Sequence, residues 1–533
     1  MKKFLALMLA CLMLAAMLAG CGSGQEETAA PASSGTANPG APAESSGGGD
    51  VEPEEEAFTR FEDMETVEVY MMAWGQWDGF DQVAEEINKI TEAEINVHCN
   101  LHQIFIAQYA NEIGMELAAQ STIDLCMVGA GGASSFSSMS SQNMLTPLND
   151  YLPYYAPELY DVMGKFLPAN TVDGKILAVP ALRMYNTSEW LLMRQDILDY
   201  LDLNEEAAAV DSWSSLEALL IKVREAQDSL PQELQTNCVL GLQNAKGGVI
   251  AYNGLEYVAD KFAENKAYDY LGLMYLAVDP DTNEVLPWII SDETRALFDR
   301  MAVYYDEGLL YRDAATTDDY SDNMIAAGMA FAYFCNGEYG APANKSTTTG
   351  YQIYGKVAVP IGITTSYVNS WGWGIPSTAE SPEAAAALLN LLYTNAEIEN
   401  LLVWGIRGRD YELNDEGEAY FLDTAQYRGL EFFYGNQFNA YPSVGQGSDF
   451  RARQWEDNEA GKISPYFGLT VDSTSITNEL TAVQAVIDKY YPTLGCGAAK
   501  TDAVWDQFKQ ELYDAGLQTI LDYYQEAVDA FVS

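Results

Sequence analysis

Hydrophobic positions along this chain alternate between two spacings. Residues 66–74, TVEVYMMAW, form an apolar run of strand length, and residues 78–91 then carry apolar side chains every three or four positions, as an amphipathic helix does. Asp78 is the expected N-cap of that helix. A second strand, a second helix and a third strand follow over 94–104, 106–120 and 122–132. This alternation predicts an α/β domain in which helices cover a largely parallel sheet.

Turn signals divide the rest of the chain. Asp173-Gly174 predicts a tight hairpin, residues 211–227 read as a capped helix, and Asp279 to Glu284 predict a second hairpin turn. Near the C-terminus the helical period dominates, over residues 476–491 and 504–531. No solenoid repeat and no long heptad pattern is present.

Two loops stand out because each follows a predicted strand. They are WGQWDG, residues 74–79, and GAGGASS, residues 129–135. In open α/β sheets, ligands bind in the loops beyond the carboxyl ends of the strands. The sequence therefore predicts that both loops lie at a ligand site.

Composition limits the class of partner. The 533 residues are 48% hydrophobic, which is enough apolar material for two or more domains. Asp and Glu number 78 against 27 Lys and Arg, so the formal net charge is −51. A polyanion repels nucleic acid and anionic lipid, and it suits a neutral ligand better than an anionic one.

The N-terminus has the layout of an export signal. Lys2 and Lys3 precede the apolar run 4–18, which is shorter than the roughly 20 residues that span a bilayer. The run ends in LAGC, which resembles the lipobox of bacterial lipoproteins, so we expect a signal peptide over residues 1–20 and a lipidated Cys21, with an ordinary signal peptide as the alternative. Residues 21–57 are rich in Gly, Ser, Ala, Pro and Glu, which predicts a disordered tether.

The remaining cysteines show no framework. Cys11 leaves with the signal, and the other five have no CxxC spacing, so neither a disulfide set nor a zinc site is indicated. Most lie in apolar runs, and we expect buried free thiols at Cys99, Cys126, Cys238, Cys335 and Cys496.

Several stretches in a fixed order carry a family resemblance. They are LAGC, VEVYMMAW, STIDLCMVG, NMLTPLNDYL, VDGKILAVP, DSWSSLEALL and, most specific, VNSWGWGIPSTAESPEAAAALLNLLYTNAEIENLLVWGI. Together they resemble the extracellular solute-binding proteins of bacterial ABC importers, in the sugar-binding branch that includes maltose-binding protein. PYFGLTVDSTSITNEL and ELYDAGLQTILDYY extend the likeness to a subset with an extra C-terminal domain of unknown function.

The resemblance implies an α/β, two-lobed, type II periplasmic-binding-protein-like fold with a hinge between the lobes. Lobe 1 would comprise residues 58–180 with 375–410. Lobe 2 would comprise residues 181–370 with 411–533, including a helical C-terminal region. The aromatic pattern of a maltose site is not reproduced position by position, so the identity of a sugar stays open.

The first loop has the residue types that a sugar site needs. Pyranose rings have one apolar face and a rim of hydroxyls, so they bind flat aromatic side chains together with polar groups. Trp74, Gln76, Trp77 and Asp78 supply both kinds within one loop. The alternative is that one tryptophan packs beneath the following helix.

Ser370-Trp371-Gly372-Trp373-Gly374 stands where the resemblance places the second hinge. Its glycines allow the backbone to change during closure, and Trp371 and Trp373 could face the cleft. In a strand, however, alternate residues share one face, so both could equally be core.

Further ligand candidates come from loops that the resemblance places at the cleft. They are Asn336, Glu338 and Tyr339, which follow an apolar strand, and Arg183 and Tyr185, which follow the first hinge. Ordinary polar turns are the alternative.

Neither a metal, a cofactor nor a catalytic site is predicted. His98 and His102 would lie about 13 Å apart on one strand, too far for one ion. Asp279, Asp281 and Asn283 mimic a calcium loop, but its twelfth position would be Ile290 rather than Glu. No GxSxG, P-loop or HExxH motif occurs.

The sequence therefore predicts a binding protein and no enzyme: a monomer, lipid-anchored on the extracellular face of the cell membrane, or periplasmic if a second membrane is present. It would capture a carbohydrate, an oligosaccharide above all, and deliver it to the permease subunits of an ABC importer. The membrane would be contacted only through the lipid. The alternatives are a binding protein for a peptide or another polar solute, or a surface glycosidase or adhesin.

Overall fold

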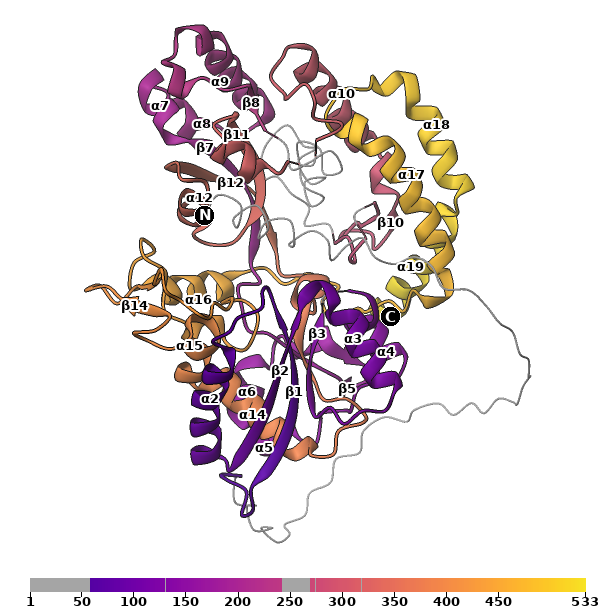
Figure 1. Cartoon of the computed structure of the whole chain (residues 1–533). Helices are drawn as coiled ribbons and strands as arrows, with labels where there is room; N and C mark the ends of the chain where they lie inside the picture. Colours follow the sequence, from indigo (N-terminus) through magenta and orange to yellow (C-terminus); the bar gives the residue numbers. More distant parts are fainter. Residues whose placement is uncertain (1–57, 130, 242–268, 274, 318) are drawn as a thin grey trace, which may run out of the picture.

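The structure, a computed structural model, describes residues 58–129, 131–241, 269–273, 275–317 and 319–533. These residues form two α/β lobes, one above the other in Figure 1, with long C-terminal helices beside the upper lobe. The predicted two-lobed fold is confirmed. The signal segment, Cys21 and the tether lie outside the described residues.

The lower lobe, lobe 1, is built on a five-stranded sheet in the order β2-β1-β3-β13-β6. The strands are β1 (Glu65–Ala73), β2 (Val97–Phe105), β3 (Leu125–Gly129), β6 (Val179–Pro180) and β13 (Trp371–Gly374). The first three run parallel, as the alternation of strands and helices predicts, whereas β13 pairs antiparallel with β3 and β6. Because β13 enters directly from lobe 2 and pairs with the end of β3, the carboxyl edge of the sheet faces the other lobe.

Helices cover both faces of this sheet. The neighbours are α2 (Phe80–Glu94), α3 (Ile106–Ala118), α4 (Phe136–Ser141), α5 (Leu152–Tyr155), α6 (Pro157–Met163), α14 (Pro382–Thr394) and α15 (Ala396–Trp404). The predicted apolar stripe of α2 is buried at Phe80, Val83 and Ile87. The prediction of Asp78 as the N-cap is wrong. The turn closes one residue later, through a 3.1 Å bond from the Phe80 N–H to the Trp77 carbonyl, so Gly79 caps the helix and Asp78 is exposed.

Lobe 2 has a four-stranded sheet in the order β12-β7-β11-β8. The strands are β7 (Thr187–Arg194), β8 (Cys238–Leu240), β11 (Ala330–Gly337) and β12 (Ile353–Gly362). Its helices are α7 (Gln195–Leu201), α8 (Asn204–Ala209), α9 (Trp213–Ala226), α10 (Asp292–Asp306), α11 (Ser321–Ala326) and α12 (Ala341–Thr349). The predicted cap of α9 is confirmed as a capping box between Ser212 and Ser215.

The predicted hairpins are also present. Residues on either side of Asp173-Gly174 form β4 (Thr171–Val172) and β5 (Lys175–Ile176). Those around Asp279–Glu284 form β9 (Ala277–Val278) and β10 (Val285–Leu286), and a third pair is β14 (Tyr411–Leu413) with β15 (Ala419–Phe421).

The C-terminal region is joined to lobe 2 through α10. It consists of α17 (Thr477–Gly495), α18 (Thr501–Asp514) and α19 (Leu517–Val532), with a break at Gly516, whose φ of 106° suits only glycine. One side of α10 contributes Leu297 and Met301 to the core of lobe 2, whereas Phe298 packs among the C-terminal helices. Helix α10 therefore lies between two separate cores, that of lobe 2 and that of the C-terminal helices, and contributes side chains to both.

Three segments cross between the lobes: 181–186, the stretch 363–370 that contains α13 (Thr365–Val368), and 461–466 after α16 (Phe450–Ala460). The second and third lie side by side, because Ile363 donates to the Lys462 carbonyl at 2.8 Å and Ser464 donates to the Ile363 carbonyl at 2.9 Å. The first is tied to the third through Asn458, whose side-chain oxygen accepts the Tyr185 N–H at 2.6 Å.

The segment before the third crossing packs with lobe 1. The sequence assigned residues 411–533 to lobe 2, whereas the fully buried Tyr427, Phe433 and Tyr434 lie in the core of lobe 1. The motif-based boundary missed this segment because it carries no strand or helix period.

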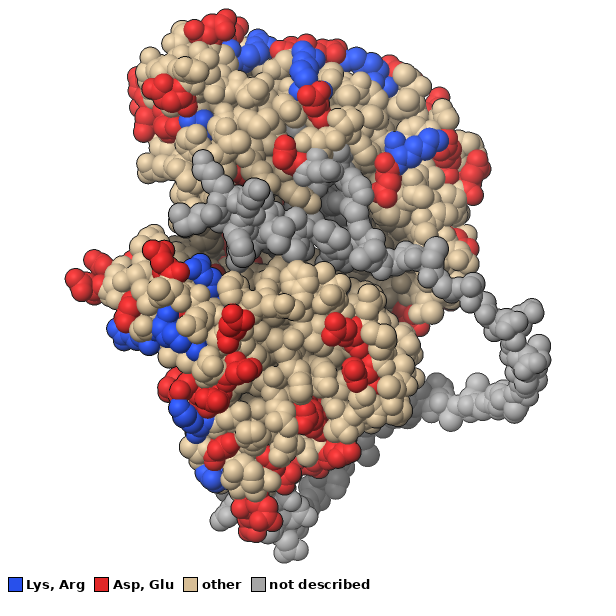
Figure 2. All heavy atoms as spheres, viewed as in Figure 1, with Lys and Arg blue, Asp and Glu red and all other residues tan. Residues whose placement is uncertain are grey.

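The surface and the thiols match the composition. Cys99, Cys126, Cys238, Cys335 and Cys496 are all free and buried, as predicted. Acidic side chains are spread over the visible surface of both lobes in Figure 2. None of the helices in the described part of the chain is long and apolar enough to cross a membrane.

Replacing Phe298 by Ala tests the connection through α10. Its ring is 1% exposed and lies 5.7 Å from Tyr491 and 6.2 Å from Trp505, centroid to centroid. Phe298→Ala should lower the free energy of unfolding in urea by about 3–5 kcal/mol because it leaves a cavity. Val303→Ala, at a 50% exposed site on the same helix, is the control and should change it little. Equal effects of both changes would contradict the packing of α10 against the C-terminal helices.

A buried carboxyl predicts pH-dependent stability. Glu399 on α15 is 0% exposed, and burial raises its pKa to about 8, an effect that the Asn436 N–H and Arg451 offset only in part. The Glu399 carboxyl loses its proton near pH 4.5 in the unfolded chain and near pH 8 in the folded chain. Between these two values only the folded chain holds the proton, so the free energy of unfolding falls by about 1.4 kcal/mol for each unit that the pH rises.

Glu399→Gln should therefore gain stability relative to the wild type between pH 5 and pH 8, as measured by urea unfolding at both values. Glu397→Gln, at an exposed site on the same helix, should not. A wild type and a Glu399→Gln variant with the same pH dependence would rule out the raised pKa.

Candidate functional site

The loop after β1 brings its side chains to the carboxyl edge of the lobe 1 sheet. Trp74 and Trp77 are partly buried, whereas Gln76 and Asp78 are exposed. The Trp77 ring folds back over Gly75, where a Cβ would lie 3.2 Å from the ring, so a larger residue there would push the ring aside by a few tenths of an ångström. The indole N–H groups of Trp74 and Trp77 are shielded from solvent and have no hydrogen-bond partner. Such groups cost about 1–3 kcal/mol each when they stay unpaired.

Three aromatic rings from distant segments meet at this edge. The Phe433 ring lies 5.8 Å from that of Trp74 and 4.7 Å from that of Trp371, centroid to centroid. Trp371 reaches this position because it pairs with Gly129, where a Cβ would lie 2.6 Å from the tryptophan ring. We call Trp74, Trp371 and Phe433 the aromatic wall; Phe433 is 0% exposed and supports the two partly exposed tryptophans, which are its solvent-facing members. Phe433 was missed by the sequence reasoning, and the only signal for it is the aromatic run EFFYG.

Two predicted ligand residues lie in the core. Trp373 is 1% exposed and its indole N–H donates to the Tyr434 carbonyl. Although it shares a strand face with Trp371, it lies two residues deeper in the lobe. Tyr185 is fully buried against Phe166, and its hydroxyl donates to the Ala181 carbonyl. The ligand roles expected for Trp373 and Tyr185 are therefore corrected to structural ones, because neither side chain reaches the solvent.

Arg183 is the centre of a hydrogen-bond network at the hinge. The side chain is buried, and its guanidinium lies over the Tyr367 ring, with the guanidinium carbon 4.2 Å from the ring centroid. One nitrogen donates to the Tyr367 hydroxyl at 3.2 Å, and another donates to the Tyr367 carbonyl at 3.0 Å and to Ser370 Oγ at 2.9 Å. Glu338 Oε1 lies 3.9 Å away. The arginine thus joins the first crossing to the second.

Glu338 completes this network from lobe 2. It follows β11, and its carboxylate accepts the Tyr367 hydroxyl at 3.0 Å. Burial raises the pKa of Glu338, and the charge of Arg183 counters part of this rise. Both the arginine and the carboxylate are engaged within the protein, so they hold the hinge segments together.

The two other candidates of lobe 2 flank Glu338. Asn336 is partly buried, and its side-chain nitrogen is shielded and without a partner. The Tyr339 ring packs against Phe450 at 5.9 Å between centroids. Asn336 is thus the lobe 2 candidate with an unused donor.

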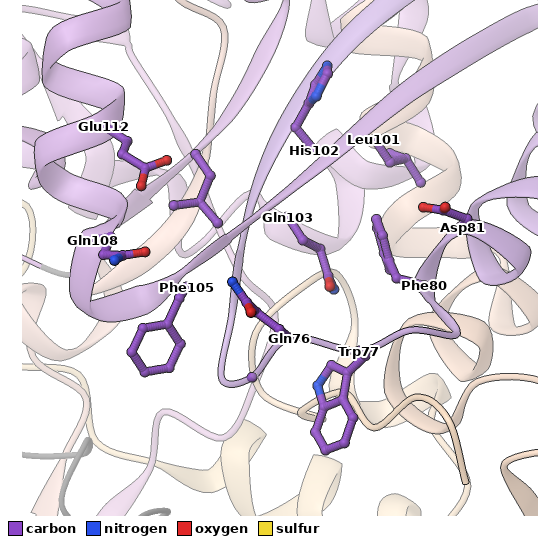
Figure 3. A pocket seen from close by; sticks show the side chains of 12 residues that line it. Gln76, Trp77, Phe80, Asp81, Leu101, His102, Gln103, Phe105, Gln108 and Glu112 are labelled. Carbon is purple, nitrogen blue, oxygen red and sulfur yellow. The ribbon is translucent and has the colours of Figure 1, made fainter.

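A groove of about 440 Å³ opens beside the first loop (Figure 3). Its polar and aromatic lining comes from the loop, α2, β2 and α3, and comprises Gln76, Trp77, Phe80, Asp81, His102, Gln103, Phe105, Gln108 and Glu112. Sequence reasoning found Gln76 and Trp77 but not the residues of β2 and α3, which are adjacent only because β2 pairs with β1 in parallel.

The two histidines and the hairpin that resembles a calcium loop make contacts with other residues of the protein. His98 contacts Glu92 and His102 contacts Glu68, each at 2.7 Å. In the hairpin, the Tyr466 hydroxyl donates to the Asn283 side-chain oxygen at 2.8 Å. Among the described residues there is no group of three or more His, Cys, Asp or Glu side chains placed to hold a metal ion.

Comparison with known families gives two matches. Residues 84–406 match the model of the bacterial extracellular solute-binding proteins. Residues 465–533 match a domain of unknown function, DUF3502.

Individual relatives are distant but cover most of the chain. A curated protein of Streptococcus pneumoniae serotype 4, named a carbohydrate ABC transporter substrate-binding protein, is 19% identical over 468 residues, 85% of this chain and 89% of its own length.

Two solved structures share the fold. The N-glycan transport solute-binding protein of S. pneumoniae superposes with a TM-score of 0.73 at 18% identity, covering 88% of this chain and 99% of its own, and it has also been solved with Man1GlcNAc and with Man5GlcNAc. An extracellular solute-binding protein of Bifidobacterium longum subsp. infantis has a TM-score of 0.63 at 17% identity, with coverages of 88% and 99%.

The two tryptophans of β13 should differ in their contribution to stability. Trp373→Ala removes a fully buried ring and should lower the free energy of unfolding by about 3–5 kcal/mol. Trp371→Ala removes a partly exposed ring and should cost clearly less, in the same urea titration followed by circular dichroism. Equal losses would mean that Trp371 also belongs to the core.

Proposed function

The chain belongs to the family of bacterial extracellular solute-binding proteins, and we propose that it captures an oligosaccharide between its lobes and delivers it to an ABC importer. The observation that carries the choice of ligand is the aromatic wall. The partly exposed rings of Trp74 and Trp371 come from distant segments and meet, through the buried ring of Phe433, at the sheet edge that faces lobe 2. A sugar ring needs such platforms for its apolar face.

Candidate polar groups for the hydroxyl rim come from the first loop of lobe 1 and from lobe 2. Gln76 and Asp78 are exposed in the first loop, and Asn336 has an unpartnered side-chain nitrogen on the side of lobe 2. Amides donate and accept, so they match hydroxyls, which do the same. Candidates on both lobes would let a ligand bridge them, and its contacts would favour the closed form.

Relatives support a carbohydrate. One is named a carbohydrate ABC transporter substrate-binding protein, and the N-glycan transport solute-binding protein has been solved with Man1GlcNAc and with Man5GlcNAc in two further structures, whose TM-scores to this chain are 0.64 and 0.61. Both match this chain along nearly its full described length.

Binding in this proposal is non-covalent, and no bond of the ligand is made or broken. Arg183 and Glu338 would act on the hinge rather than on the ligand, because the two terminal guanidinium nitrogens and one carboxylate oxygen are hydrogen-bonded to Tyr367 and Ser370. The protein would be anchored through a lipid on Cys21, on the outer face of the cell membrane, where permease subunits recognise the closed lobes.

The test is binding by Trp371→Ala, which removes one platform of the wall. Isothermal titration against neutral oligosaccharides should show saturable binding by the wild type, and at least a tenfold loss in the variant, since ring stacking contributes about 0.5–1.5 kcal/mol beyond the area it buries. Phe61→Ala, a partly buried aromatic at the opposite end of β1, is the control and should bind normally.

Two outcomes would contradict the proposal. Saturable binding of peptides and of no oligosaccharide would assign another ligand class. Hydrolysis products in the titration cell, detected by chromatography, would make the protein an enzyme.

A further inference from the structure

We propose that the groove beside the first loop is a distinct sugar subsite that accepts an uncharged sugar unit and excludes one that carries a carboxylate. The inference rests on the proposed function and specifies which sugars the site admits. It is drawn from four properties of the groove: its place, its size, its lining and its charge.

The groove belongs to lobe 1 alone. All its lining residues lie between Gly75 and Glu112, at the carboxyl ends of β1 and β2 and the start of α3. It therefore exists whether the lobes are open or closed, unlike a site made by their contact. Its volume of about 440 Å³ falls within the range of small-molecule sites, about 300–1,000 Å³.

It is also separate from the aromatic wall. None of Trp74, Trp371 and Phe433 lines it, although Trp77 lies only three residues beyond Trp74. A ligand that uses both must therefore extend over more than one sugar unit, with one unit on the wall and another in the groove.

The lining has the chemistry of a sugar site. Trp77 and Phe105 offer partly buried rings, and three amides, Gln76, Gln103 and Gln108, stand around them (Figure 3). Rings suit the apolar face of a pyranose, and amides suit its hydroxyls. The shielded indole N–H of Trp77 is an additional donor that a rearranged loop could offer.

The groove is lined by negatively charged side chains. Asp81 and Glu112 line it, and no Lys or Arg is among its lining residues. In the described part of the chain neither carboxylate takes part in an ion pair or a hydrogen bond. Carboxylates accept hydrogen bonds from sugar hydroxyls, but they repel a uronate or a sialate.

No neighbouring cation is free to offset this charge. His102, which also lines the groove, contacts Glu68 at 2.7 Å. Arg409 approaches the first loop, where it donates to the Gly79 carbonyl at 3.1 Å, but its guanidinium is paired with Asp410. A ligand carboxylate would thus lose its hydration and meet two negative charges.

The experiment uses a glycan array printed with neutral oligosaccharides and with the same oligosaccharides ending in a uronic acid. The wild-type protein should bind neutral glycans and bind their acidic counterparts at least tenfold more weakly, which is about 1.4 kcal/mol. Asp81→Asn/Glu112→Gln should reduce this ratio at least fivefold. The control Asp63→Asn/Glu85→Gln removes the same charge at exposed sites of lobe 1 outside the groove and should leave the ratio unchanged.

A salt series on the wild-type protein distinguishes electrostatic repulsion of the acidic glycans from their steric exclusion. Raising salt from 0.05 to 0.5 M should weaken the discrimination, because exposed charges are screened. A ratio that does not change with salt would mean steric exclusion and would overturn the proposal.

The outcomes also separate this inference from the proposed function. Equal binding of neutral and acidic glycans, or a groove variant that behaves like the control, would overturn the subsite and leave sugar capture intact. A wild-type protein that binds no glycan of either class would overturn both.

Discussion

Burying an arginine side chain is costly unless its charge and most of its donors are matched inside the protein. Arg183 is buried at the first crossing between the lobes, and the groups that match it come from elsewhere: Tyr367 and Ser370 on the second crossing, and Glu338 from the end of β11. The segments must therefore stay together. This requirement fixes the point about which the lobes meet, and with it the edge of the sheet that faces lobe 2.

The sheet edge that carries the aromatic wall depends on the hydrogen-bond network of Arg183. The second crossing continues directly into β13, whose first residue, Trp371, must lie against the end of β3, and Gly129 leaves the room for it. Phe433, from a segment without regular structure, then fills the space between Trp371 and Trp74. The aromatic wall is thus a consequence of strand pairing across a long sequence distance. The groove arises in a simpler way, because β1 and β2 are parallel neighbours and their following loops end at the same edge.

Much of the fold was predictable because its signals are local. The strand at 66–74, the helix that follows it, the capped α9 and the turn at Asp173-Gly174 each follow from spacing or from turn chemistry within a few residues. The N-cap of α2 was predicted one residue too early, since a turn of backbone hydrogen bonds, and not the side chain of Asp78, sets where the helix begins. Such errors at element ends are expected, because the cap depends on geometry that the residue type alone does not fix.

The sequence by itself determined the α/β class, the acidic surface, the free buried thiols and the loop that carries Trp74 and Trp77. Only the tertiary structure decided which aromatic residues line the cleft edge. Trp371 and Trp373 are two positions apart on one strand face, yet one meets Phe433 at the edge and the other is closed over by Tyr434. A pattern of alternation reports which face a side chain is on, but not how deep along the strand the surface ends. That depth is set by a segment about 60 residues further along the chain, 427–434, which has no regular secondary structure, so the sequence alone could not provide it.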